Sequence, residues 1–278
     1  MWQEACIKGN AKSIVIGLDE AESPQDRTIL EQTLKAEPKE TNMAFWLVLI
    51  GHGTFDGRTA KFNLRGPDVS AEDLAEWLKP FHRPVAAINT SSSSAPFISK
   101  LSAQNRVLIT ATKSGYELNY TRFCQYFTDA ITNPQADLDK DGQTSLLEAF
   151  LTASNRVTEF YLAAGRLATE HALLDDNGDG LGTPADWFRG IRPVKNAGNN
   201  ASPDGYRAHQ FHLVLSEAEN TMPSQMRAKR DRLELEVIKL RDLKDTLPED
   251  EYFSKLEKLL CEIAQIYKQT EKADNNPM

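Results

Sequence analysis

The amino-acid sequence predicts an α/β fold in which a mostly parallel sheet is flanked by helices. Its 278 residues, 40% of them hydrophobic, suffice for a full buried core. Four short apolar runs, rich in β-branched residues, suit strands that are covered on both faces. Amphipathic stretches alternate with these runs, as expected for a parallel sheet between helices. The predicted strands are residues 13–17, 45–50, 85–89 and 107–112.

The amphipathic stretches between these runs predict helices at 26–34 and 70–78. In the second helix Ser70 is the expected N-cap, and Asp73 follows at the spacing of a capping box. Each helix lies between two successive strands, so each is expected to cover a face of the sheet.

From about residue 120 the periodicity of the apolar residues becomes helical. We expect helices at 120–131, 144–164 and 167–174, separated by polar loops that contain glycine. Residues 192–205 are rich in turn-forming residues and predict a surface loop. Residues 209–215 are expected to form a last edge strand.

The C-terminal residues 216–278 predict a second part of the chain, a coiled-coil-like antiparallel helical hairpin that follows a domain over 1–215. Apolar residues recur at spacings of three and four in two stripes, which a break at 246–248 separates. The stripes consist of Met226, Leu233, Val237, Leu240 and Leu247, and of Tyr252, Phe253, Leu256, Leu259, Ile263 and Ile266. Such a hairpin serves either as a solvent-facing brace or as a surface for self-association or for another protein.

Composition argues against several classes of function. A net charge of −8 and a pI near 5.3 are unfavourable for binding nucleic acid or an anionic membrane, and favourable for recruiting cations. The apolar run at 45–51 is too short to span a bilayer. Three widely spaced cysteines, Cys6, Cys124 and Cys261, imply no complete disulfide framework, and the last two are expected to fill apolar helical faces.

Residues 137–148 match the twelve-residue loop of a calcium-binding EF-hand. Alternate side chains of such a loop converge on one ion, glycine at the sixth position permits a sharp turn, and the last glutamate contributes both oxygens. The alternative is an acidic loop that caps the following helix. The expected ligands are Asp137, Asp139, Asp141, Gln143 through its carbonyl, Ser145 and Glu148.

A weaker form of the same pattern occupies residues 175–186. Aspartate is a shorter and poorer bidentate ligand than the glutamate usual at the twelfth position. The alternatives to a second calcium site are a turn held by asparagine and glycine, or an ancestral structural role. The expected ligands are Asp175, Asn177, Asp179 and Asp186.

Polar loops follow the second and third predicted strands. GHGTFDG follows the second strand, and NTSSSSAPF follows the third. Ligands of open α/β sheets bind beyond the carboxyl ends of the strands, so both loops are expected to face one crevice. This arrangement places His52 near one of the serines.

Three segments resemble the legumain-like cysteine peptidases, which have the caspase fold. They are LVLIGHG (47–53), INTSSSSAPFI (88–98) and VLITATKSGYELNY (107–120), and the similarity extends over roughly residues 10–190. The segments are similar to the family's histidine strand, its nucleophile strand and the strand that follows. The matching positions are His52, Gly53, Asn89, Thr110, Ala111, Glu117 and Tyr120.

The sequence departs from this family at the nucleophile. To within one residue, Ser92 stands where the resemblance places the catalytic cysteine, and His52 stands at the catalytic histidine position. A serine hydroxyl needs a positioned base and an orienting group, whereas a thiol is partly ionised at neutral pH. Four interpretations follow: an inactive pseudoenzyme that keeps a peptide groove, an active endopeptidase using the His52/Ser92 dyad, an engineered Cys-to-Ser change, or a calcium-dependent scaffold.

The resemblance also implies a missing strand. The family fold has one more strand before 13–17, near the centre of the sheet, and residues 2–10 resemble the end of the helix that follows it. We therefore expect the chain to begin within the domain. An export signal, as in exported bacterial homologues, would then precede residue 1, and the sequence assigns no compartment.

Overall fold

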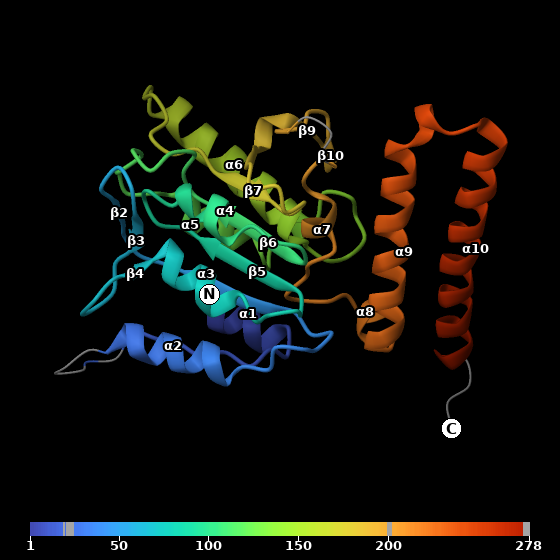
Figure 1. Cartoon of the computed structure of the whole chain (residues 1–278), viewed down its shortest axis with the longest axis horizontal. Coiled ribbons are helices and arrows are strands. Elements are labelled where there is room, and N and C mark those ends of the chain that lie inside the picture. Colours follow the sequence, from blue (N-terminus) through green and yellow to red (C-terminus); the bar gives the residue numbers. More distant parts are fainter. Residues whose placement is uncertain (19, 21–24, 199–201, 275–278) are drawn as a thin grey trace. The chain divides into compact units, whose positions relative to one another are not determined.

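The computed structural model describes residues 1–18, 20, 25–198 and 202–274, and the chain divides into two compact units (Figure 1). The units are Met1–Val214 and Leu215–Met278. The first unit is α/β and contains a mixed, mostly parallel sheet. The second unit is helical.

The main sheet has five strands in the order β1-β5-β6-β7-β8. β1, β5 and β6 pair in parallel, and their register places Leu49 beside Asn89 and Asn89 beside Thr110. β7 is antiparallel to β6, and β8 is antiparallel to β7, so four of the five strands run in one direction. Their bounds are β1 (Phe45–Leu49), β5 (Val85–Asn89), β6 (Arg106–Thr110), β7 (Leu173–Asp175) and β8 (Thr183–Pro184).

Side chains of the central strands point alternately to the two faces of the sheet, and each face has its own apolar core. Ala86 and Ile88 of β5 point to one face with Val107 and Ile109 of β6, while Val85 and Ala87 point to the other. The first face is covered by α1 (Trp2–Lys8), α5 (Phe123–Ala130) and α6 (Leu146–Ala163). The second face is covered by α2 (Asp26–Ala36), α3 (Ala71–Leu78) and α4 (Pro96–Leu101) (Figure 1). Burial on both faces explains why the strand sequences are continuously apolar.

Several sequence predictions are confirmed in these elements. Three of the four predicted strands form, and the helices predicted at 26–34 and 70–78 are α2 and α3. Ser70 Oγ accepts a hydrogen bond from the Asp73 N–H at 3.0 Å, and Asp73 Oδ2 accepts one from the Ser70 N–H at 2.9 Å. This reciprocal pair is the predicted capping box.

The strand predicted at 13–17 is wrong. Ile14 and Val15 are 50% and 47% exposed, and Gly17 has a φ of +91°. Among the described residues no strand pairs with this segment. β-branched residues form a strand only where a neighbouring strand accepts their backbone hydrogen bonds, and here that neighbour is lacking.

Two predictions in the second half of the domain are also wrong. The segment predicted as a helix at 167–174 is an irregular connection that leads into β7. α6 stops before Gly165 (φ +60°), and residues 173–175 form a strand that pairs with the outer edge of β6. The strand predicted at 209–215 is reduced to one β-bridge between Ser145 and His212, because α7 (Tyr206–His209) occupies its start. Of the surface loop predicted at 192–205, residues 199–201 lie outside the described part of the chain.

Smaller elements complete the first unit. An antiparallel sheet follows β1, in the order β2-β3-β4, and a two-stranded ribbon joins β9 to β10. Their bounds are β2 (Gly53–Phe55), β3 (Ala60–Phe62), β4 (Val69–Ser70), β9 (Phe188–Arg189) and β10 (Arg192–Pro193). Short 3-10 turns are η1 (Pro134–Ala136) and η2 (Ala185–Trp187).

The second unit consists of α8 (Glu217–Thr221), α9 (Ser224–Asp242), the turn η3 (Lys244–Thr246) and α10 (Glu249–Asp274). α9 and α10 pack against each other around Met222, Leu233 and Ile266. Arg230 of α9 forms ion pairs with Glu219 and Asp231, which ties α8 to α9. Among the helices of the described residues, none is both long and apolar enough to cross a membrane.

Candidate functional site

The segments after β1 and β5 lie at the same edge of the sheet. Because Leu49 and Asn89 are neighbours in the parallel register, residues 50–53 and 90–94 leave the sheet together. The structure therefore brings His52 and the serine segment to one edge. It also buries Ser91, Ser92, Ser93 and Ser94, each of which is at most 3% exposed.

The hydroxyl of Ser92 is held by the backbone of Gly53. Ser92 Oγ donates to the Gly53 carbonyl at 3.0 Å and accepts from the Gly53 N–H at 3.2 Å. A Cβ at Gly53 would lie 2.2 Å from the Ser92 carbonyl oxygen, so only glycine permits this approach. Gly53, the glycine of the His-Gly pair, therefore allows the segment after β1 to pack closely against the serine segment after β5.

The neighbouring serines are also engaged by buried polar groups. Ser91 Oγ donates to the Asn89 side-chain carbonyl at 2.7 Å, and Ser94 Oγ lies 3.1 Å from Thr112 Oγ1. Ser93 has a φ of +54°, and its buried Oγ has no hydrogen-bond partner among the described residues. A non-glycine residue in this conformation is strained, and such strain gathers at functional segments.

His52 is separated from this hydrogen-bond network. Its side chain is exposed, and its ring lies beside that of Tyr120, with ring centroids 6.4 Å apart. Within the described residues no hydrogen bond joins His52 to Ser92, whose hydroxyl is fully engaged by Gly53. The predicted pair thus lies at one edge of the sheet, and its action as a catalytic dyad stays a prediction.

A pocket of about 110 Å³ opens beside His52. The Cys124 side chain, on the first turn of α5, forms part of its lining, and burial raises the pKa of this thiol. A neutral thiol in a mostly apolar lining favours contact with a small uncharged group. The lining residues are Ile50, Gly51, His52, Thr90, Tyr120, Thr121 and Cys124.

Large apolar side chains are exposed on the segment that leads to this pocket. Tyr116 is 72% exposed, Leu118 61% and Tyr120 68%. Glu117 between them is fixed: its Oε1 lies 2.5 Å from His171 Nδ1, and its backbone carbonyl accepts the Ser93 N–H at 2.9 Å. The roles of Cys124 and His171 were missed by sequence reasoning, because neither belongs to a recognisable motif.

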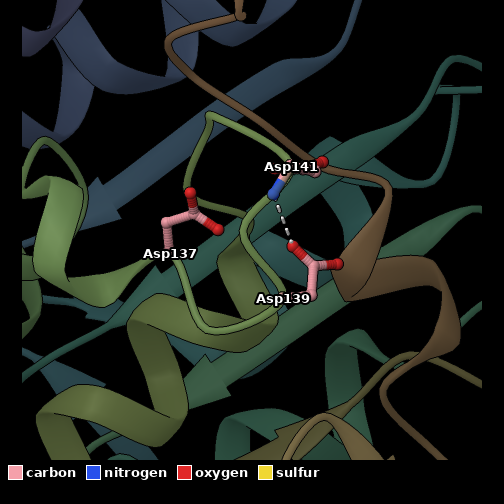
Figure 2. Close-up of side chains that lie close together, drawn as sticks. All are labelled: Asp137, Asp139 and Asp141. Atoms are coloured by element: carbon pink, nitrogen blue, oxygen red, sulfur yellow. Dashed lines mark hydrogen bonds between the residues drawn. The ribbon is translucent and has the colours of Figure 1, made fainter.

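The first calcium-type loop gathers three aspartates. Oxygen atoms of Asp137, Asp139 and Asp141 all lie within 4.8 Å of one another (Figure 2). Asp137 is buried, whereas Asp139 and Asp141 are exposed. Three carboxylates this close repel one another without a cation, and oxygen ligands of this kind suit a hard divalent ion. These residues can therefore hold a metal ion.

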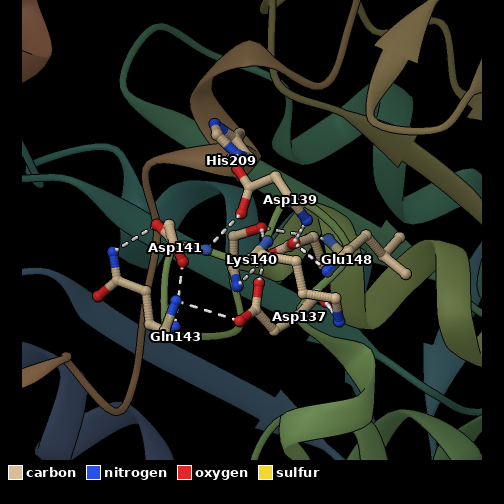
Figure 3. A network of polar contacts seen from close by, with 10 residues as sticks. Asp137, Asp139, Lys140, Asp141, Gln143, Glu148 and His209 are labelled. Atoms are coloured by element: carbon tan, nitrogen blue, oxygen red, sulfur yellow. Dashed lines mark hydrogen bonds and ion pairs between the residues drawn. The ribbon is translucent and has the colours of Figure 1, made fainter.

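The backbone of the loop is folded around Asp137. Its Oδ1 accepts the Lys140 N–H at 2.6 Å and its Oδ2 accepts the Gly142 N–H at 3.1 Å (Figure 3). Gly142 has a φ of +89°, which agrees with the sharp turn predicted at this glycine. Asp141 Oδ1 accepts the Gln143 N–H at 3.0 Å, which shapes the second half of the loop.

Glu148 and Ser145 close the loop in a different way from the prediction. Glu148 is 1% exposed, and its Oε1 accepts the Leu138 N–H at 2.6 Å while its Oε2 accepts the Ser145 N–H at 2.8 Å. Ser145 Oγ accepts the Glu148 N–H at 3.2 Å, so the two residues form a capping box at the start of α6. The glutamate ties the two ends of the loop together and does not join the three aspartates.

His209 contacts the loop from a distant part of the sequence. Its Nε2 lies 2.9 Å from Asp139 Oδ2, and the two residues are 70 positions apart (Figure 3). No spacing rule links them, so sequence analysis had no signal for this contact. The third position of the calcium-type loop is therefore tied to α7.

The second loop does not gather the acidic side chains that its spacing suggests. Among the described residues, Asp175, Asp179 and Asp186 form no group like that of the first loop. Asp186 is exposed and lies in η2. Asn177 accepts the Asp179 N–H at 2.8 Å and donates to Asp179 Oδ2 at 3.2 Å, which is the turn held by asparagine.

Two buried carboxylates that sequence analysis missed stabilise the second loop. Asp204 Oδ1 accepts the Asp176 N–H at 2.9 Å, and Asp176 Oδ2 accepts the Ala208 N–H at 2.7 Å. Burial, followed by the charge of Asp176, raises the pKa of Asp204 to about 8, and burial raises that of Asp175 to about 6. These contacts join residues 176–177 to residues 204–208, so the network is structural.

Comparison of the chain with protein-family models, with curated proteins and with solved structures found no match.

Proposed function

We propose that this protein is a caspase-fold, legumain-like peptidase homologue that binds peptide segments without cleaving them and is stabilised by calcium. The observation that carries the proposal is the hydrogen bonding of Ser92, whose hydroxyl both donates to and accepts from the Gly53 backbone. The sheet order, in which the histidine segment follows β1 and the serine segment follows its parallel neighbour β5, is compatible with this ancestry.

Catalysis by Ser92 is disfavoured by geometry and by chemistry. An attacking serine needs a base within about 2.6–3.2 Å and must reach the substrate carbonyl. Ser92 is 3% exposed, and its proton is directed to the Gly53 carbonyl rather than to His52. Freeing the hydroxyl would break two buried hydrogen bonds, each with a net value of about 0.5–1.5 kcal/mol.

Binding of an extended peptide is favoured by the surface around His52. The 110 Å³ pocket accepts a small side chain, and the exposed ring of Tyr120 offers apolar area at its lining. Tyr116, four residues earlier in the chain, is also exposed and packs edge-on against Phe55. Exposed aromatic residues near a pocket are typical of recognition surfaces. The ligand class is therefore a peptide with a small, uncharged side chain for the pocket.

Calcium is the ion that the loop at 137–148 fits best. Its three clustered carboxylates and its twelve-residue sequence spacing are those of a calcium loop, and the protein's net charge of −8 favours cation binding. The ion would neutralise Asp137, Asp139 and Asp141 at the start of α6. Its role is to order this region and α7, which His209 connects to the loop.

Peptide cleavage tests the proposal. A mixed fluorogenic peptide library is incubated with the protein, with and without calcium, in parallel with Ser92→Cys, His52→Ala and the neighbouring control Ser91→Cys. We expect no cleavage by the native chain. Cleavage that His52→Ala abolishes would show that Ser92 is a working nucleophile and would overturn the proposal.

Peptide binding is measured separately with a displayed library of random peptides. Tyr120→Ala is expected to weaken the selected peptides about tenfold, as loss of an aromatic contact usually does. Leu167→Ala, at a residue 91% exposed and outside the pocket lining, is the control and should leave affinity unchanged. An equal loss of peptide affinity in both variants, or a library from which no peptide is selected, would contradict peptide binding at this pocket. The calcium-dependent scaffold would then be the favoured interpretation.

A further inference from the structure

One wall of the pocket beside His52 is formed by the segment that joins β6 to α5. Tyr120, Thr121 and Cys124 of the pocket lining belong to this segment or to the first turn of α5. We call residues 113–124 the wall segment. The Tyr120 side chain is mostly exposed, so its position depends on how the backbone is fixed on either side of it.

The C-terminal side of the wall segment is held by Glu170. This carboxylate is 2% exposed, and it accepts the Arg122 N–H at 2.8 Å and the Phe123 N–H at 2.9 Å. Within the described residues Arg122, the N-cap residue, gives α5 no side-chain cap, so the distant carboxylate satisfies N–H groups that the start of the helix leaves free. Thr121 Oγ1 also donates to the Thr90 carbonyl at this side.

The N-terminal side of the wall segment is held by His171, the next residue after Glu170. His171 Nδ1 lies 2.5 Å from Glu117 Oε1, and because an ionised carboxylate can only accept, the imidazole donates from Nδ1. Glu117 Oε2 accepts the Lys113 N–H at 2.9 Å, and the Glu117 carbonyl accepts the Ser93 N–H at 2.9 Å. The residue that His171 contacts therefore joins the start of the wall segment to the serine segment.

We propose that Glu170 and His171 are positioning residues of the pocket, which hold the wall segment on both sides of Tyr120. Both lie in the irregular connection between α6 and β7, and neither lines the pocket, so they act through Glu117 and the start of α5. The proposal rests on the proposed peptide site for its ligand. A wall that is fixed before a peptide arrives loses less conformational entropy on binding.

Amide hydrogen exchange of the full chain, resolved to single residues, tests the anchor at His171. His171→Ala should speed exchange of the Lys113 and Ser93 amides by about tenfold, as expected for loss of a partly exposed hydrogen bond to a charged group. The two amides that Glu170 holds should exchange at the native rate. Exchange in β6 should also be unchanged, which separates local release from a loss of global stability.

The anchor at Glu170 should give the opposite pattern. In Glu170→Gln an amide group replaces one acceptor oxygen with a donor, so the Arg122 and Phe123 amides should exchange faster while the Lys113 amide does not. Tyr161→Phe is a milder variant of the same anchor, because it removes only the hydroxyl that donates to Glu170 Oε1 at 3.1 Å. It should shift the same two amides in the same direction.

A conservative variant separates the hydrogen bond of His171 from the packing of its ring. His171→Asn places an amide N–H donor close to the position of Nδ1, so it should restore native exchange although its side chain is smaller. The control is Leu167→Ala, in the same connection at a residue 91% exposed, which should exchange like the native chain.

The shape of the pocket is measured at the Cys124 thiol, in a background that carries Cys6→Ser and Cys261→Ser. Iodoacetamide alkylates this thiol: the sulfur displaces iodide from carbon, and the thiol proton is released to solvent. With the wall released, His171→Ala should be labelled about tenfold faster than His171→Asn. Neither variant carries a charge at this position, so the difference reports the hydrogen bond.

Native exchange of the Lys113 amide in His171→Ala overturns the proposal. So does exchange in His171→Asn that is as fast as in His171→Ala, or exchange that rises equally in β6. Equal labelling of Cys124 in the two variants would show that the anchors do not set the shape of the pocket. Neither assay uses a peptide, so a chain that binds no peptide contradicts the proposed function and leaves these outcomes as they stand.

Discussion

The calcium-type loop gives a prediction whose size can be worked out. Asp139 offers one of the three clustered carboxylates, and it is exposed, so Asp139→Ala removes a ligand without leaving a cavity in the core. For a loop with a Kd on the order of 10⁻⁵ M, calcium at about 100 times the Kd stabilises the folded state by about 2.7 kcal/mol. In a domain of this size, that corresponds to a rise in Tm of roughly 5–11 °C.

The assay is scanning calorimetry of the native chain in millimolar calcium and in chelator, at matched ionic strength so that screening is equal. Asp139→Ala should cancel the rise in Tm. The matched control is His209→Ala, which removes the contact of His209 Nε2 with Asp139 Oδ2 and keeps the carboxylate. This variant should retain the response to calcium, because the ligand set is intact.

Two results would refute the reasoning about this loop. No shift of the native Tm at millimolar calcium would mean that the three aspartates hold no such ion, and that Glu148 and Ser145 alone stabilise the loop as a helix cap. An equal loss of the calcium response in His209→Ala would trace the effect to the contact with α7 rather than to ligation.

Three further predictions concern stability. Gly53→Ala should lower the free energy of unfolding in urea by roughly 1–3 kcal/mol, because a Cβ would lie 2.2 Å from the Ser92 carbonyl oxygen; an unchanged midpoint would contradict the close approach. Leu74→Ala, at a fully buried side chain of α3, should lower it by about 2–5 kcal/mol, and a smaller loss would mean that the core around α3 collapses into the cavity. The hydrogen bonds and charge of Arg65 lower the pKa of the buried Asp26 carboxyl. The Asp26–Arg65 pair therefore stabilises the folded state fully above the unfolded-state pKa of about 3.9, and this stabilisation is lost as the pH falls through the lower folded-state pKa. Asp26→Asn should therefore flatten the acid limb of the stability curve, and identical acid limbs in the two proteins would refute the assignment.

The local patterns of the sequence determined much of the fold. Residues 85–88 and 107–109 are apolar at every position because both faces of the central strands are covered, and that pattern can be read without a structure. The capping box of Ser70 and Asp73 spans four residues, and the three clustered aspartates of the calcium-type loop span five. Interactions over such short spans depend on backbone geometry that the spacing itself defines.

Long-range contacts decided the rest. The 13–17 segment has the composition of a strand and forms none, since a strand requires a partner that its own sequence cannot supply. Ser92 and His52 lie at the same edge of the main sheet. The Ser92 hydroxyl donates its hydrogen bond to the Gly53 carbonyl, 39 residues away in the sequence. The contacts of Asp204 with Asp176 and of His209 with Asp139 span 28 and 70 residues. Which buried group meets which partner over such distances is fixed by how the elements pack, and no periodicity or spacing in the chain records it.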